Sequence, residues 1–324
     1  KNDEYGVLDI SGGKITSTFS QSIQNWGKAT LSGGQFLGGP VATWSQRQGS
    51  TGDGNSVTGE TIITGDAVIY KNVETHNING GDAPSVTVTG GTVKGSFAKY
   101  EATTGEGGAL SSSQVDINDG SSSIVVSGGN FASPVPDAIL AKGSELVTND
   151  DGTVTVAGES TVAVMDGKGY TSFTDAVAAA KSGSTITLLK DQELTSSVTI
   201  PVGVTVDLGR NTLSVSENAP GNAFGIVFTS GESVFKNGVL LDKRTAAGPA
   251  LGAVNSASLS LQDVEVNRLI PSSGSTNIVE VQSGASLTLD SGAKVSEVKV
   301  DGRSGFTFGV VVLGSSTEAR VDEQ

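Results

Sequence analysis

Two aspartates that follow repeated apolar blocks are the strongest candidates for acid chemistry. The blocks are Val206-Asp207, Phe235-Lys236, Leu261-Gln262 and Leu289-Asp290, and they recur at intervals of roughly 26 to 29 residues, as stacked repeats do. Paired carboxylates can cleave glycosidic bonds or hold calcium when they converge on one site. The repeat instead predicts an outward row in which Lys236 and Gln262 separate Asp207 from Asp290, as on a solvated face. We therefore expect no enzyme activity; if the chain is an enzyme, Asp207 and Asp290 are its catalytic residues.

Other catalytic and metal-binding arrangements have less support. The chain has no Cys and a single His, His76, which excludes thiolate metal sites and a Cys nucleophile. A lone His on a strand is typically a surface or hydrogen-bonded residue. The adjacent acids Asp150 and Asp151 precede Gly152 and indicate a turn with only a weak capacity for Ca²⁺. We expect no bound metal and no cofactor.

Aromatic residues are the better candidates for ligand contact. Trp26 and Trp44 lie in the polar, turn-like segments Asn-Trp-Gly and Thr-Trp-Ser, and Tyr100 lies farther along the first half. Exposed aromatic faces stack on sugars, whereas buried ones pack against neighbouring loops. We predict that Trp26, Trp44 and Tyr100 contact a glycan, with the two tryptophans as the better pair.

Composition and charge limit the classes of partner. The 324 residues include 45 Gly and 36% apolar types, and the net charge is −14. This charge repels nucleic acid and anionic lipid, and no apolar stretch is as long as a membrane span, which needs roughly 18 residues. We expect no nucleic-acid partner and no membrane insertion. Because the chain begins with Lys1 rather than Met, we expect a segment of a longer protein.

Short alternating apolar runs predict an all-β protein with frequent turns. The blocks after residue 200 form three series that each recur about every 27 residues, which is typical of a parallel β-helix with three strands per turn. The first half instead repeats a Ser/Thr-Gly-Gly word at 11–13, 32–34, 89–91 and 127–129. We interpret each glycine pair as a tight bend between two sheets, in turns of about 21 to 38 residues with loops at 47–55 and 101–114.

The repeats predict two β-helical modules, stacked or in tandem, at residues 1–156 and 157–324. One helix is expected near 173–181, because Ser172 and Asp175 form a capping box and Lys181 and Gly183 suit its end. Its apolar face and three consecutive alanines suggest that it covers the open end of the second module.

Residues 170–191, followed by 198–213, resemble the opening of pectate-lyase-like right-handed parallel β-helix modules found in surface proteins of Gram-positive, often gut-dwelling, bacteria. The Ser-Gly-Gly-Asn-Phe word at 127–131, with 138–143 and 149–156, is similar to the way such modules close. The resemblance implies a right-handed β-helix. Such modules serve adhesion and spacing, among other roles, and a shared fold does not assign one of them.

These observations predict a non-enzymatic structural or adhesive module of a secreted or cell-surface bacterial protein, with a host or environmental glycan or protein as its ligand. A homo-oligomer or a place in a larger fibre is compatible with this role. Two alternatives stay open. One is a phage virion decoration protein or receptor-binding fibre, and the other is a polysaccharide lyase or glycoside hydrolase of the β-helix type.

Overall fold

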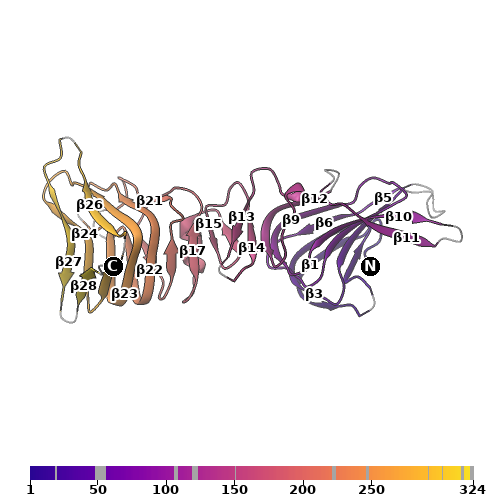
Figure 1. The fold of residues 1–324 in the computed structure, drawn as a ribbon, viewed down its shortest axis with the longest axis horizontal. Helices are drawn as coiled ribbons and strands as arrows, with labels where there is room; N and C mark the ends of the chain where they lie inside the picture. The colour runs from indigo at the N-terminus through magenta and orange to yellow at the C-terminus, as the bar shows by residue number, and fades with distance from the viewer. Residues whose placement is uncertain are drawn as a thin grey trace. The chain divides into compact units, whose positions relative to one another are not determined.

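A computed structural model describes residues 1–18, 20–47, 56–105, 109–118, 123–149, 151–220, 224–245, 248–290, 292–300, 302–314 and 317–321. The predicted all-β class is confirmed: the described residues form parallel-rich β-sheets with one short α-helix and one 3-10 helix (Figure 1). The chain forms two compact units, of which the first comprises Lys1–Ser160 and Gly167–Gly169 and the second Thr161–Asp166 and Tyr170–Gln324. Asp150 and residues 48–55 of the expected loop at 47–55 lie outside the described residues.

The first unit contains two sheets, which we name sheet A and sheet B. Sheet A has the strand order β11-β10-β8-β4-β2, with β5 paired to β4. Its strands are β2 (Ile23–Asn25), β4 (Val41–Gln46), β5 (Val57–Thr58), β8 (Val73–Ile78), β10 (Phe97–Thr104) and β11 (Leu110–Val115). Sheet B has the order β1-β3-β6-β9-β12-β14-β13, with β7 paired to β3 and β9. Its strands are β1 (Val7–Thr16), β3 (Lys28–Leu37), β6 (Glu60–Ile63), β7 (Val68–Ile69), β9 (Ser85–Val93), β12 (Ile124–Phe131), β13 (Glu145–Thr148) and β14 (Val154–Ala157).

Most neighbouring strands of the first unit are parallel and come from successive passes of the chain. In sheet B, Val7 pairs with Lys28, Lys28 with Glu60, Glu60 with Ser85, and Val86 with Ile124. The separations of these partners along the chain all differ and lie between roughly 21 and 38 residues, as in an irregular solenoid. The expected irregular length of the passes is therefore confirmed.

The Ser/Thr-Gly-Gly words lie inside strands β1, β3, β9 and β12, so they bend the strands of sheet B and do not join two sheets as expected. A Cβ at Gly33 would lie 2.3 Å from the carbonyl oxygen of Ser11 on the preceding pass, and Gly34 has a φ of +89°. The first glycine thus allows close approach of two backbones and the second supplies the left-handed bend.

The segment 101–114 is not the loop that we expected. Residues of β10 and β11 pair as an antiparallel hairpin from Lys99 with Val115 to Thr104 with Leu110. Sequence reasoning missed it because this segment lacks alternating apolar residues. Most of β11 is exposed, and the hairpin relies on backbone hydrogen bonds that tolerate Ser and Thr.

The second unit contains most strands of a 14-stranded sheet. The strands of this sheet are β15 (Ala163–Met165), β16 (Lys168–Tyr170), β17 (Thr185–Leu188), β18 (Gln192–Leu194), β19 (Val198–Ile200), β20 (Thr205–Asp207), β21 (Thr212–Val215), β22 (Ile226–Asp242), β23 (Leu251–Leu269), β24 (Ser275–Gln282), β25 (Ser286–Leu289), β26 (Lys294–Val298), β27 (Phe306–Leu313) and β28 (Glu318–Val321).

The long strands β22 and β23 curve along their length (Figure 1). Successive thirds of β22 pair in parallel with β19, β20 and β21, and bends at Ser230 and Asn237 have positive φ. The predicted first repeat series is confirmed, because Val206 pairs with Phe235, Phe235 with Leu261, and Leu261 with Leu289. Inward side chains of the three series form one apolar core, which includes Val206, Phe235 and Leu261.

Helix α1 (Phe173–Ala179) begins as predicted, with Ser172 as its N-cap and the Ser172 hydroxyl accepting from the Asp175 amide at 3.1 Å. It buries Phe173, Ala176 and Val177 in the core of the second unit. The helix ends two residues earlier than expected, because Ala180 already has an extended backbone with ψ 145°. Lys181 therefore lies outside the last turn, in a turn that its carbonyl closes by accepting from the Ser184 amide at 2.9 Å. Gly183 has a positive φ but follows too late to serve as the C′ residue.

Sheet A of the first unit has one face toward an apolar core and an opposite face that carries different side chains. The core lies between sheets A and B and includes Leu31, Ile63, Val88 and Phe131. On sheet A, Val41, Val73 and Phe97 face this core. Because side chains alternate along a strand, residues three positions later on β4, β8 and β10 project from the opposite face.

Candidate functional site

Four aromatic side chains, Trp26, Trp44, His76 and Tyr100, form one continuous stack on the outer face of sheet A, and we name them the aromatic row. The ring centroids of Trp26 and Trp44 are 5.3 Å apart, those of Trp44 and His76 are 4.0 Å apart, and those of His76 and Tyr100 are 4.6 Å apart. The three interplanar angles are 24°, 10° and 8°. The structure thus brings together all three predicted ligand-contact residues and adds His76.

Strand register produces this row. Trp44 on β4 pairs directly with His76 on β8, and His76 pairs with Tyr100 on β10. Neighbouring strands lie about 4.8 Å apart, so side chains at one register position stack ring upon ring. Trp26 immediately follows β2, and its amide donates to the Asn2 carbonyl at 2.9 Å, which holds the indole at the end of the row.

Burial differs sharply along the row. Trp44 and His76 in the middle are each 6% exposed, whereas Trp26 and Tyr100 at the ends are half-buried. The Lys1 ammonium lies 5.9 Å from the Trp26 ring centroid, a cation–π contact. Trp26 and Tyr100 are therefore the more accessible rings of the row, while both middle rings stack between two neighbouring rings.

A carboxylate lies beside the imidazole. Glu74 Oε2 is 3.1 Å from His76 Nε2, and Glu74 is itself 8% exposed. Burial raises the pKa of the Tyr100 phenol, and the negative charge of Glu74 raises it further. Tyr100 therefore stays a neutral hydrogen-bond donor into the alkaline range.

The row carries polar atoms that have no hydrogen-bond partner in the described part of the chain. These atoms are Trp26 Nε1, Trp44 Nε1 and His76 Nδ1, and each is buried. A buried donor or acceptor without a partner costs about 1–3 kcal/mol. The two indole N–H groups are donors, and His76 Nδ1 is an acceptor in the tautomer whose Nε2–H donates to Glu74.

The candidate acids lie elsewhere, in the second unit, and they do not converge. Asp207 accepts from the Gly209 amide and from Asn237 Nδ2, each at 2.9 Å, and lies 3.4 Å from the Lys236 ammonium. Asp290 accepts a hydrogen bond from the Ser260 hydroxyl. Three strand spacings separate the two aspartates, since β20 pairs with β22, β22 with β23 and β23 with β25. That is about 14 Å, beyond the roughly 5–9.5 Å of paired glycosidase carboxylates.

The turn at Asp151 behaves as the sequence indicated. Its carboxylate accepts from the Thr153 hydroxyl at 2.7 Å and from the Thr153 amide at 2.9 Å. These hydrogen bonds lower the pKa of Asp151. No cluster of three or more His, Cys, Asp or Glu with metal-binding geometry occurs among the described residues.

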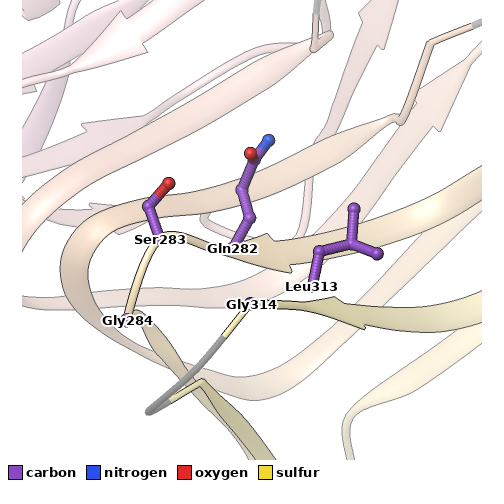
Figure 2. Close-up of a pocket in the computed structure, with 5 residues that line it drawn as sticks. All are labelled: Gln282, Ser283, Gly284, Leu313 and Gly314. Carbon is purple, nitrogen blue, oxygen red and sulfur yellow. The ribbon is translucent and has the colours of Figure 1, made fainter.

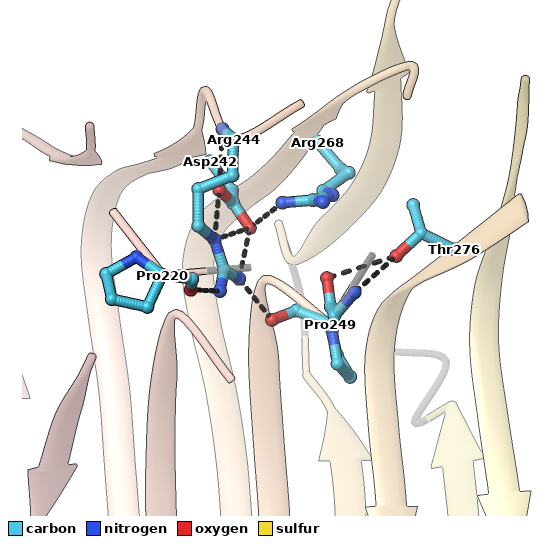
Figure 3. Close-up of polar contacts among 7 residues, drawn as sticks. Pro220, Asp242, Arg244, Pro249, Arg268 and Thr276 are labelled. Carbon is cyan, nitrogen blue, oxygen red and sulfur yellow. Dashed lines mark hydrogen bonds and ion pairs between the residues drawn. The ribbon is translucent and has the colours of Figure 1, made fainter. Parts of the chain in front are cut away.

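A buried ion network in the second unit was missed by sequence reasoning (Figure 3). Arg244 Nε and Nη2 donate to the two carboxylate oxygens of Asp242 at 2.9 and 2.7 Å, and Arg268 donates to the same carboxylate. Arg244 also donates to the carbonyls of Pro220 and Pro249, at 3.2 and 2.8 Å. The spacing of Asp242 and Arg268, which are register partners one repeat apart, could have revealed it.

The network is structural. All three side chains are at most 1% exposed. Burial lowers the pKa of Arg268; the Asp242 charge opposes this shift, and the Arg244 charge adds to it. Because its contacts join β22, β23 and the segments around the two prolines, the network ties successive passes of the chain together.

One open depression of about 480 Å³ lies in the second unit, where the turns after β24 and β27 meet (Figure 2). It is lined by Gln282, Ser283, Gly284, Leu313 and Gly314. The lining has one amide and one hydroxyl side chain and no ionisable group, so it offers no acid–base chemistry.

Within the described residues, no helix is long and apolar enough to cross a membrane. No family model, no curated protein and no solved structure matches this chain.

Proposed function

We propose that the chain is a non-enzymatic structural and adhesive module of a secreted or cell-surface bacterial protein, and that it binds a glycan at the aromatic row. The parallel pairing of successive passes supports a right-handed parallel β-helix for each unit, as in the pectate-lyase-like modules that the sequence resembles. Such a fold suits a stiff module, because each pass is hydrogen-bonded to the next along the axis.

The observation that carries the glycan proposal is the aromatic row with its unpartnered donors. A sugar presents apolar C–H faces together with hydroxyl oxygens. The half-buried Trp26 and Tyr100 supply aromatic surface for the C–H faces of the sugar. The Tyr100 hydroxyl stays protonated and can donate to a sugar hydroxyl oxygen. The Trp26 N–H has no hydrogen-bond partner among the described residues. A small shift of the Trp26 ring would bring this N–H to a ligand oxygen, which would then accept its hydrogen bond.

The placement of the acids supports a non-enzymatic role. Asp207 is neutralised by Lys236 and shares its oxygens with two further donors. Its distance from Asp290, about 14 Å by strand spacing, leaves no shared site for a sugar ring between two carboxylates.

The test is binding to a broad glycan array, followed by titration of each hit. Both tryptophans of the chain belong to the row, so their intrinsic fluorescence reports on this site alone. We expect a glycan that changes this fluorescence on titration, and at least tenfold weaker binding in Trp26→Ala and Tyr100→Ala.

Tyr5→Ala is the matched control, because Tyr5 is 81% exposed and takes no part in the row. Its binding should equal that of the unchanged chain. Circular dichroism should show that all three variants fold. Absence of binding across the array, or equal loss in Tyr5→Ala, would refute the glycan site. Release of new sugar ends that is abolished in Asp207→Asn or Asp290→Asn would refute the non-enzymatic role.

A further inference from the structure

The aromatic row connects the two indoles of the chain to a phenol. Both tryptophans, Trp26 and Trp44, belong to the row, and the chain has no Cys. Because thiols are absent, indoles and phenols are the side chains that lose an electron most easily. Successive ring centroids are 5.3, 4.0 and 4.6 Å apart, and the ring planes differ by at most 24°. Stacking at this separation brings the π systems into contact, so the row is a continuous path for an electron.

A positive charge formed on the middle indole stays mobile. Trp44 is 6% exposed, and its buried Nε1 has no hydrogen-bond partner among the described residues. An oxidised indole becomes fixed when its N–H proton passes to a base, and no described group is placed to accept this proton. The Glu74 carboxylate lies 3.1 Å from His76 Nε2 and is itself buried. Its negative charge favours movement of the positive charge toward the Tyr100 end, since charges interact strongly in a buried environment.

Tyr100 is the end of the row at which this charge is neutralised. Its ring stacks on His76 and is half-buried. The next strand, β11, places Gln114 beside Tyr100 and therefore adds no further ring. A phenol that loses an electron also releases its O–H proton, which makes it easier to oxidise than an indole near neutral pH. The charge that begins on an indole thus ends on Tyr100 as a neutral phenoxyl radical.

We propose that the aromatic row carries an oxidising equivalent from its indoles to the Tyr100 phenol. A one-electron oxidant takes one electron from Trp26 or Trp44 and is itself reduced. An electron from Tyr100 then refills the indole by way of the His76 ring, and the Tyr100 O–H proton passes to water. The products are the restored indole, the reduced oxidant, one proton and the Tyr100 phenoxyl radical. His76 bridges two rings and is not itself oxidised, because imidazole holds its electrons more tightly than indole or phenol.

The test is pulse radiolysis of the full chain without glycan, with the azide radical as a one-electron oxidant that prefers indole to phenol. We expect the absorption of the indole radical to decay while that of the phenoxyl radical grows at the same rate. This rate should not change with protein concentration, because the transfer is internal. Tyr100→Phe should abolish the phenoxyl growth that accompanies the indole decay.

Tyr70→Phe is the matched control, because Tyr70 belongs to the same unit, contacts the Lys94 ammonium and takes no part in the row. It should transfer at the unchanged rate. His76→Phe keeps a bridging ring and should retain the rate within about twofold, whereas His76→Ala leaves two strand spacings, about 9.6 Å, without a ring and should slow transfer about tenfold.

Circular dichroism shows whether each variant folds, and Tyr100→Phe, which removes only a hydroxyl, decides the proposal if His76→Ala does not. The proposal is overturned by any of three results. These are the absence of internal transfer, a rate that rises with protein concentration, and a Tyr100→Phe variant that transfers like the unchanged chain.

Discussion

Replacing Asp242 by Asn should destabilise the second unit more than any comparable loss of charge at the surface. The carboxylate of Asp242 lies between the guanidinium groups of Arg244 and Arg268, and the three side chains are at most 1% exposed. Asn keeps the shape of the side chain but removes its charge. Two buried cations then lose the negative charge that offsets their desolvation.

The expected cost follows from this burial. Removing one partner of a buried ion network destabilises a protein by about 3–5 kcal/mol. For a folded unit of this size, each kcal/mol lowers the melting temperature by about 2–4 °C. We therefore expect a decrease of about 6–20 °C for the second unit.

The assay uses two signals. Both tryptophans, Trp26 and Trp44, lie in the first unit, so Trp fluorescence follows that unit, and far-UV circular dichroism follows both. The transition seen by circular dichroism but not by fluorescence belongs to the second unit, and only this one should shift in Asp242→Asn.

The control is Glu193→Gln, which removes the same charge from an exposed ion pair with Lys243 at 2.9 Å. Pairs of this kind contribute at most about 1 kcal/mol. If Asp242→Asn lowers the melting temperature no more than Glu193→Gln, the buried network does not stabilise the unit and the reasoning is wrong.

Three further changes test the first unit. Gly33→Ala should destabilise it by more than about 1 kcal/mol in urea unfolding, since its Cβ would lie 2.3 Å from the Ser11 oxygen, whereas Gly12→Ala meets no atom within 4 Å and should be near neutral. Because burial raises the Tyr100 pKa, its contribution to stability is complete below about pH 10 and is lost as pH rises through the raised folded value. Tyr100→Phe should remove that alkaline decrease, as measured by melting temperature against pH. Trp44→Ala should cost about 3–5 kcal/mol by opening a cavity in the row, and a loss under about 1 kcal/mol by urea unfolding would contradict the packing.

Periodic features were predictable because they follow from local rules. Alternating apolar residues identify strands, and blocks such as Val206, Phe235 and Leu261 recur at the spacing that stacks them. The capping box at Ser172 placed the start of the helix to the residue. Its end was misplaced because Ala180 could continue a helix by propensity, and only the turn at Lys181 and Ser184 decides otherwise.

The candidate site could be predicted only in part. The sequence by itself determined the all-β class, the repeat and the aromatic types that could contact a ligand, because composition and period are properties of the chain alone. Only the tertiary structure decided that Trp26, Trp44, His76 and Tyr100 form one row and that Asp207 and Asp290 lie apart. The physical reason is register: passes of unequal length separate these residues along the chain, and the pairing of each strand with the next sets which side chains meet.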